Sequence, residues 1–218
     1  MLTLTSSAIT IADLETQFNL RYTQDINFFF EWNNTLPALT DIEKERCDRL
    51  KTSYLYLLRY PPLLEDTVKM VVLSPLLDLA GFYLPPFHIQ SEASIEIIDQ
   101  EKNVTVKGNL DSLILCESLW VLVIESQKAL FSLEAGKAQL LSYLLASPQL
   151  PNQPIYGLLT NGSNFAFLKL AYDNDVPIYS LSDEFILHNR ENGLYKVLQI
   201  LKYFAQAFSK NNELTPNS

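Results

Sequence analysis

Two acidic residues on neighbouring predicted strands are the side chains in this sequence best placed to do chemistry. Asp111 interrupts an apolar run, and Glu125 follows the buried segment 120–124. Because the connection between the two strands is short, they can pair antiparallel, which sets Asp111 beside Glu125. Two carboxylates that close raise each other's pKa unless a cation lies between them. The pattern therefore predicts a site for a hard divalent ion, Mg²⁺ or Mn²⁺.

Further polar residues follow the same pattern. Side chains alternate across a strand, so Gln127 shares a face with Glu125, whereas Ser126 points the other way. A helix predicted from 133 to 146 then carries Gln139 and Tyr143 on one face, one turn apart. By itself such a pair is common at the edge of a core. Its position after a candidate metal strand is what makes it a candidate for the site.

The predicted elements around these residues form an antiparallel meander and a crossover. Strands at 93–98, from Val104 onward and at 120–124 form the meander, whose third strand carries Glu125. The strand 155–160 is reached by crossover from the helix, which favours a mixed sheet. Strands at 165–170 and 176–181 and an amphipathic helix over 193–208 complete the pattern. We therefore expect an α/β fold with a mixed central sheet flanked by helices.

Before the sheet, the chain is predicted to be helical. Residues 1–60 are interpreted as an N-terminal helical extension, with short helices at 12–18 and 25–32 and a longer helix begun by a Thr40–Glu43 capping box. A helix over 63–79 follows, with a kink expected at Pro75 and an end at Gly81. Glu65 lies on its first turn, where the helix dipole stabilises an acid whether or not it has a further role. Residues 61–210 form the main domain, and 211–218 are predicted to be a flexible tail.

Several of these residues resemble the core of the PD-(D/E)xK nuclease superfamily, in the variant with a Q-x-x-x-Y helix found in RecB-like nucleases. The chain is also similar to the N-terminal nuclease region of type I restriction enzyme R subunits. In that region a Gly-x-x-Asp strand, a Trp-Val-(hydrophobic)-Glu-x-Lys strand, a Thr-Asn-Gly turn and a Phe-x-Phe-Leu-Lys-Leu strand recur in this order. This chain has GNLD, WVLVIESQ, TNG at 160–162 and FAFLKL at 165–170. The resemblance covers residues 60 to 180.

The resemblance implies a restriction-endonuclease-like core and metal-dependent hydrolysis of DNA phosphodiester bonds. Asp111 and Glu125 would hold Mg²⁺ or Mn²⁺, and Glu65 would help through water. Gln139 and Tyr143 would position the DNA backbone or a catalytic water. The implied partners are DNA and either other restriction-system subunits or a second copy of the chain. A module that keeps the fold for nucleic-acid binding or subunit assembly but has lost the chemistry is the alternative, and a purely structural interaction protein is a third interpretation.

One departure from the family separates these alternatives. Where the family has its catalytic lysine, this chain has Gln127, followed by Lys128. Glutamine offers a neutral donor and acceptor instead of a positive charge. Lys128 leaves the strand on the opposite face, and only a bulge or the end of the strand would let it reach the site. We therefore expect metal binding with weak nuclease activity.

Composition narrows the remaining possibilities. The chain has 218 residues, of which 48% are hydrophobic, and sixteen basic against twenty-five acidic residues give a net charge of −9. This sign opposes broad attraction to nucleic acid, so a local group of lysines should flank the cleft, with Lys107, Lys128, Lys137 and Lys169 as candidates. No apolar run has the ~20 residues of a membrane helix, and two distant cysteines fit a reducing cytoplasm. Two isolated histidines make a zinc site improbable, and no serine-nucleophile or phosphate-loop motif is present.

Overall fold

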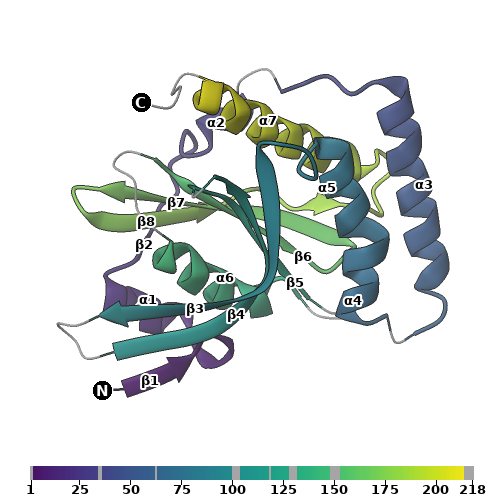
Figure 1. Ribbon diagram of the computed structural model, residues 1–218. Coiled ribbons are helices and arrows are strands. Elements are labelled where there is room, and N and C mark those ends of the chain that lie inside the picture. The colour runs from purple at the N-terminus through teal and green to yellow at the C-terminus, as the bar shows by residue number, and fades with distance from the viewer. Residues whose placement is uncertain are drawn as a thin grey trace.

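The protein has a mixed α/β fold in which helices flank one mixed sheet (Figure 1). The computed structural model describes residues 2–33, 36–61, 63–99, 104–117, 119–127, 132–147 and 153–213. Within them the sheet has nine strands: β1 (Leu2–Thr5), β2 (Arg21–Tyr22), β3 (Phe87–Asp99), β4 (Val104–Cys116), β5 (Leu119–Ser126), β6 (Ile155–Thr160), β7 (Asn164–Asp173), β8 (Val176–Leu181) and β9 (Phe185–Ile186). The helices are α1 (Ile11–Phe18), α2 (Phe30–Asn33), α3 (Asp41–Leu57), α4 (Glu65–Val68), α5 (Ser74–Ala80), α6 (Glu134–Ala146) and α7 (Gly193–Glu213), with a 3₁₀ turn η1 (Ser6–Ala8) and a π-helical turn η2 (Lys69–Leu73).

The predicted meander and crossover are confirmed. β3 pairs antiparallel with β4, and β4 pairs antiparallel with β5. After β5 the chain crosses through α6 and returns as β6, which pairs parallel with β5. The hydrogen-bonded path runs β1-β4-β5-β6-β7-β8-β2, with β3 beside β4 and β9 beside β7. A parallel neighbour reached through a helix is what gives the sheet its mixed character.

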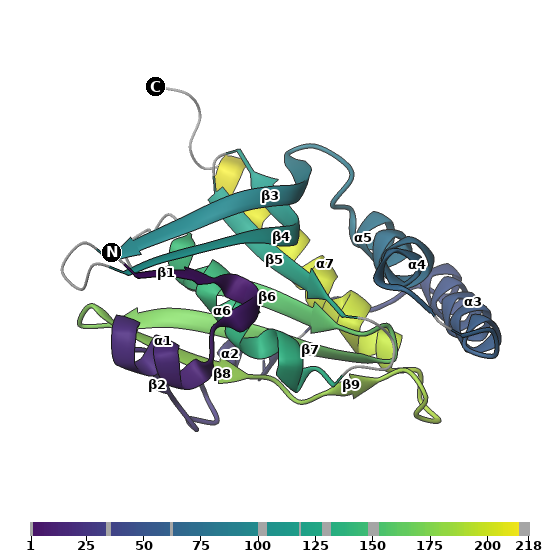
Figure 2. The same cartoon turned by 90° about the horizontal axis from the view of Figure 1, so that it is seen from below.

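Two apolar cores lie on the two faces of the sheet. Helices α1 and α6 cover one face, and α7 with α5 covers the other, as Figures 1 and 2 show. The alternation along β4 explains the division, since Leu113 and Leu115 pack in the α6 core and Ile114 and Cys116 in the α7 core. None of the helices in the described ranges is long and apolar enough to cross a membrane.

The helix predicted over 63–79 is built as three consecutive pieces. α4 passes into the π turn, in which Ser74 N–H donates to the carbonyl of Lys69, and α5 follows. Pro75 lies just after this turn, at the start of α5, and the wider turn leaves room before a residue that has no N–H to donate. Gly81 ends α5 with φ of 93°, as expected for a glycine cap.

The N-terminal segment is less helical than predicted. Only Phe30–Asn33 of the predicted helix 25–32 is α-helical, because the Asp25 side chain accepts a hydrogen bond from Asn27 N–H and forms a turn instead. β1 pairs parallel with the start of β4, and β2 pairs parallel with β8. The first 22 residues therefore contribute a strand to each end of the hydrogen-bonded path. The Thr40–Glu43 capping box is present, and α3 follows it.

One edge of β4 is shared between two partners, and this creates the position of the candidate site. β1 pairs with Val104–Lys107, whereas β5 pairs with Ser112–Cys116 along the same path of strands. The residues 108–111, which read Gly-Asn-Leu-Asp, lie between these two ladders. Backbone groups in this gap are available to side chains from elsewhere in the fold.

Candidate metal centre

Asp111 lies where β4 and β5 separate. The ladder between these strands runs to the Ser112 and Ile124 pair, one step short of Asp111. In the opening, Asp111 Oδ2 accepts hydrogen bonds from Ser126 N at 2.6 Å and from Ser126 Oγ at 2.8 Å. The carboxylate thus replaces the backbone acceptor that a continued ladder would have supplied. Two donors on one oxygen fix the orientation of the group.

Glu125 is the buried member of the pair. Its residue is 4% exposed, and Oε1 accepts a hydrogen bond from Gln127 Nε2 at 3.1 Å. Glu125 Oε2 is buried and has no hydrogen-bond partner within the described residues. A buried carboxylate oxygen without a donor is costly, so this atom marks a place where a cation or a proton would be stabilising.

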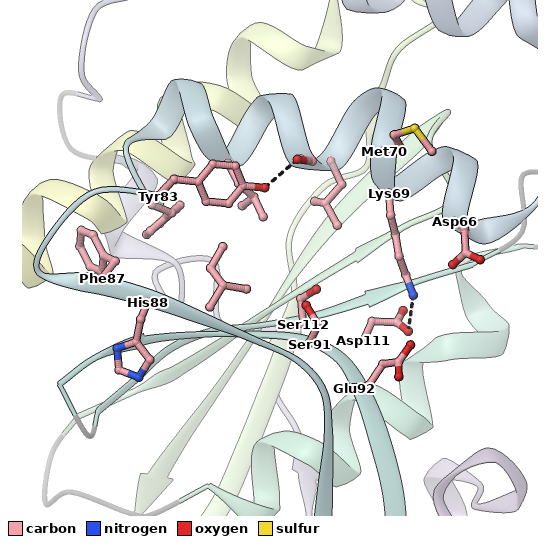
Figure 3. Close-up of a pocket in the computed structure, with 15 residues that line it drawn as sticks. Asp66, Lys69, Met70, Tyr83, Phe87, His88, Ser91, Glu92, Asp111 and Ser112 are labelled. Atoms are coloured by element: carbon pink, nitrogen blue, oxygen red, sulfur yellow. Dashed lines mark hydrogen bonds and ion pairs between the residues drawn. The ribbon is translucent and has the colours of Figure 1, made fainter.

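A third carboxylate and a lysine come from the helix on the other side of the site. Glu65 begins α4, and Lys69 lies one turn later, at the start of the π turn. Lys69 Nζ lies 2.6 Å from Glu65 Oε1 and 2.8 Å from Asp111 Oδ1. Figure 3 shows the Lys69 side chain reaching from the helix down to Asp111. One ammonium group therefore bridges two of the three carboxylates.

The electrostatics show that all these groups act on one another. Burial, then the charges of Asp111 and Glu65, raise the pKa of Glu125 to about 9, and Lys69 opposes this shift. Burial also raises the pKa of Glu65, against the hydrogen bond from Lys69. Burial lowers the pKa of Lys69, but its bonds to Asp111 and Glu65 outweigh burial and bring that pKa to about 12. Three carboxylates and one ammonium group thus form a single coupled cluster.

The carboxylate oxygens of the cluster are suitable ligands for a divalent ion, although Lys69 is bonded to two of the carboxylates. Hard oxygen ligands with net negative charge suit Mg²⁺ or Mn²⁺, and the unpartnered Glu125 Oε2 is one such donor. Within the described ranges, however, no three His, Cys, Asp or Glu side chains are grouped so that they could hold a metal ion as they stand. Asp111 and Glu65 are instead both bonded to Lys69. The residues fit a metal ion if Lys69 moves aside.

Gln139 and Tyr143 come close to the site, but the hydroxyl of Tyr143 is hydrogen-bonded to the backbone of β4. Its hydroxyl donates to the carbonyl of Asn109 at 2.8 Å and accepts from Gln139 Nε2 at 2.8 Å. It also lies 3.1 Å from Ser6 Oγ. Because Tyr143 is fully buried, it cannot touch a DNA backbone in this arrangement, and it instead fills the gap in the ladder of β4. Gln139 is half-buried and lines a groove with Asn109 and Ser6.

Glycines allow these close approaches. A Cβ on Gly108 would lie 2.1 Å from Ser6 Oγ and 2.9 Å from a ring carbon of Tyr143. A Cβ on Gly136, in the first turn of α6, would lie 3.0 Å from Gln127 Nε2. The missing side chains let η1 and α6 pack directly against the site.

Three of the four lysines predicted to flank the cleft lie in the described ranges, and each of them pairs with a carboxylate. Lys107 pairs with Glu96, and Lys137 pairs with Glu134. Lys169 is buried and bonded to Glu31 Oε1 at 2.6 Å, so its prediction as a DNA-contacting residue is wrong. The FAFLKL strand places Lys169 in the interior because the N-terminal segment covers it. Lys128 lies outside the described residues.

A groove opens beside the cluster. It has a volume of about 710 Å³, and Figure 3 shows Asp111 and Lys69 at one end and Tyr83, Phe87 and His88 at the other. Asp66 and Glu92 also line it, near the end that holds Lys69. This groove gives solvent and solutes access to the cluster from the side of Lys69.

Two contributors to the site were missed at the level of sequence. Ser126 was predicted to point away from the site, yet it donates two hydrogen bonds to Asp111 because that carboxylate lies in the opening of the ladder. Lys69 was not singled out, although Glu65 and Lys69 are four residues apart on a predicted helix, a spacing that favours an ion pair. Comparison with known proteins finds no family model that matches the chain and no curated protein that matches its sequence.

Proposed function

We propose that the protein is a metal-dependent nuclease that hydrolyses DNA phosphodiester bonds on a restriction-endonuclease-like core. The observation that carries the proposal is Glu125 Oε2, which is buried and has no partner among the described residues, in a place where the charges of Asp111 and Glu65 act on Glu125. Withdrawing carboxylates from water is costly, and Lys69 offsets this cost only at Glu65 and Asp111, which leaves Glu125 for a cation or a proton. The motif order that resembles PD-(D/E)xK nucleases supports the same conclusion.

In this function each residue has a distinct task. Asp111 and Glu125 bind the metal ion, and Glu65 takes part through water. Ser126 fixes the Asp111 carboxylate with two hydrogen bonds, and Gln127 orients Glu125 through Oε1. A divalent ion bound there supplies a Lewis acid that lowers the pKa of a bound water and polarises the scissile phosphate. With a net charge of −9, the chain would hold DNA through local contacts near the cluster.

The second candidate function is a nuclease-fold module for nucleic-acid binding or subunit assembly. A specific observation favours it: Lys69 already neutralises Asp111 and Glu65, and position 127 is a neutral glutamine. Carboxylates that are neutralised by a lysine of the same chain can form a structural ion pair without a metal ion. Metal binding separates the two candidates more directly than activity does.

The test measures Mn²⁺ binding by calorimetry and nicking of supercoiled plasmid in Mg²⁺ and Mn²⁺. Wild type, Asp111→Asn and Glu125→Gln are compared, since both substitutions keep the shape of the side chain and remove its charge. We expect wild type to bind Mn²⁺ and to nick slowly, and both variants to lose binding and nicking. Glu96→Gln is the matched control, because Glu96 is an exposed carboxylate on β3 that pairs with Lys107.

Two outcomes would contradict the proposal. Wild type that binds no Mn²⁺ would leave the binding module as the better interpretation. Nicking that survives in Asp111→Asn and Glu125→Gln at the wild-type level would show that the activity comes from another site or from a contaminating nuclease.

A further inference from the structure

Lys69 occupies the centre of the carboxylate cluster in place of a metal ion. Its Nζ lies 2.6 Å from Glu65 Oε1 and 2.8 Å from Asp111 Oδ1, with a quarter of the side chain exposed. Within the described ranges, Lys69 is the one lysine bonded to any of the three carboxylates. The position it takes is the one in which an ion bound to Asp111 and Glu65 would lie.

The local backbone is built to bring Lys69 there. Lys69 keeps α-helical geometry and donates its N–H to the carbonyl of Glu65, so the four-residue spacing puts both side chains on one face of the helix. Rotation about the bonds of the long, unbranched lysine side chain can move the ammonium group away from the carboxylates without a change in the helix. The groove beside Lys69 and Asp111 has space for the ammonium group after its displacement (Figure 3).

Position 127, the last described residue after the strand that carries Glu125, is neutral. Gln127 donates to Glu125 Oε1 at 3.1 Å and therefore acts on the carboxylate as a neutral donor. Lys107, Lys137 and Lys169 are held by other carboxylates. A phosphate brought to the cluster would meet Lys69 as the nearest described ammonium group.

We propose that Lys69 is an internal cation that holds the metal site closed and that becomes the phosphate-binding lysine once a divalent ion displaces it. This inference rests on the proposed function. Metal ion and ammonium group compete for the same oxygens of Asp111 and Glu65. Displacement leaves Lys69 positively charged at the mouth of the groove, where it binds a non-bridging phosphate oxygen. The helix thus supplies the charge that position 127 lacks.

The competition gives a prediction that a structural role for Lys69 does not share. Lys69→Met keeps the length of the side chain and removes its charge, so Mn²⁺ no longer has to displace an ammonium group. Calorimetry should then show Mn²⁺ binding on the order of ten-fold tighter than in wild type. Nicking of supercoiled plasmid in Mg²⁺ should fall by about 10²-fold, since a charged contact to the phosphate is lost. Affinity and activity therefore change in opposite directions.

Three further variants make the test specific. Lys69→Arg keeps the charge and should bind Mn²⁺ as wild type does. Lys69→Met combined with Gln127→Lys should regain nicking, because the charge returns from the strand. Lys107→Met removes a lysine on β4 that pairs with Glu96 and should change neither quantity. Circular dichroism and thermal unfolding of each variant, with and without Mn²⁺, establish that it is folded.

The inference is overturned if Lys69→Met binds Mn²⁺ no more tightly than wild type, or if Lys69→Arg binds it as tightly as Lys69→Met. It is also overturned if Lys69→Met nicks at the wild-type rate. The proposed function fails in a different way, namely when neither wild type nor the double variant nicks DNA. Tighter Mn²⁺ binding in Lys69→Met would then still support Lys69 as the internal cation of a module without nuclease activity.

Discussion

Replacing Glu125 by glutamine should make the metal-free protein more stable at neutral and alkaline pH. Glu125 is almost fully buried, and its Oε2 has no hydrogen-bond partner among the described residues. Burial and the neighbouring Asp111 and Glu65 raise its pKa from 4.5 to about 9. Glutamine has nearly the same shape and cannot ionise. The substitution therefore removes the cost of ionising a carboxyl group in this position.

The sign and size follow from proton linkage. Between pH 4.5 and 9 the unfolded chain has Glu125 ionised, whereas the folded chain keeps the proton. The folded state thus binds one proton more, and its stability falls with rising pH by about 1.4 kcal/mol per pH unit. The stability that the protonated Glu125 contributes is fully present below pH 4.5 and is lost as the pH rises to the pKa of Glu125 in the folded protein. From pH 5 to pH 8 this amounts to about 4 kcal/mol, which the glutamine variant should not lose.

Urea unfolding in EDTA at pH 5, 6, 7 and 8 measures this effect. The quantity to follow is the free energy of unfolding of Glu125→Gln minus that of wild type, because the other titrating groups cancel in the difference. We expect it to rise steadily across the series. Glu96→Gln, at an exposed position on β3, should give a flat difference.

A flat difference for Glu125→Gln would refute the reasoning. It would mean that Glu125 is ionised and solvated in the folded protein at pH 5, so that the carboxylate does not lie withdrawn from water. Added Mn²⁺ should reverse the order of stability, since only wild type keeps the charged ligand.

Two other substitutions test the packing around the site. Gly108→Ala places a Cβ 2.1 Å from Ser6 Oγ and 2.6 Å from Ser6 Cβ, so we expect the free energy of unfolding measured in urea to fall by about 1–3 kcal/mol. A second substitution, Ser6→Gly, should restore part of this loss. An unchanged unfolding midpoint in Gly108→Ala would contradict the close packing of η1 on β4. Lys169→Met leaves Glu31 buried without its ammonium partner and should lower the free energy of unfolding by about 3–5 kcal/mol. The double variant Lys169→Met with Glu31→Leu should recover most of this stability. Equal stability of the single and double variants would contradict a buried ion pair.

The antiparallel hairpin that brings Asp111 and Glu125 to the same end of two strands could be predicted because it depends on local rules. A short connection brings two strands together, and the period of two then sets which side chains share a face. The same rules placed Gln127 beside Glu125. They failed for Ser126, because β4 and β5 separate at this point and Asp111 turns into the opening.

The contact of Lys69 with Asp111 could not be predicted from such rules. The two residues are 42 positions apart, and the contact depends on how the helix docks on the sheet. The four-residue strand β1 was missed for a similar reason, since its pairing partner begins about a hundred residues later at Val104. Position 169 was misplaced because the segment that buries it, around Glu31, comes from the other end of the chain.

The placement of β1 and β2 has a consequence for the order of folding during synthesis. β2 lies at residues 21–22, yet its partner β8 lies at 176–181 and is among the last strands to leave the ribosome. Pairings of such sequence separation close late and carry a large loop-closure cost. β2 is therefore made long before its partner strand, whereas β1 can pair earlier with β4. Until β8 is available, residues 21–22 have no partner strand and stay exposed to chaperones and proteases.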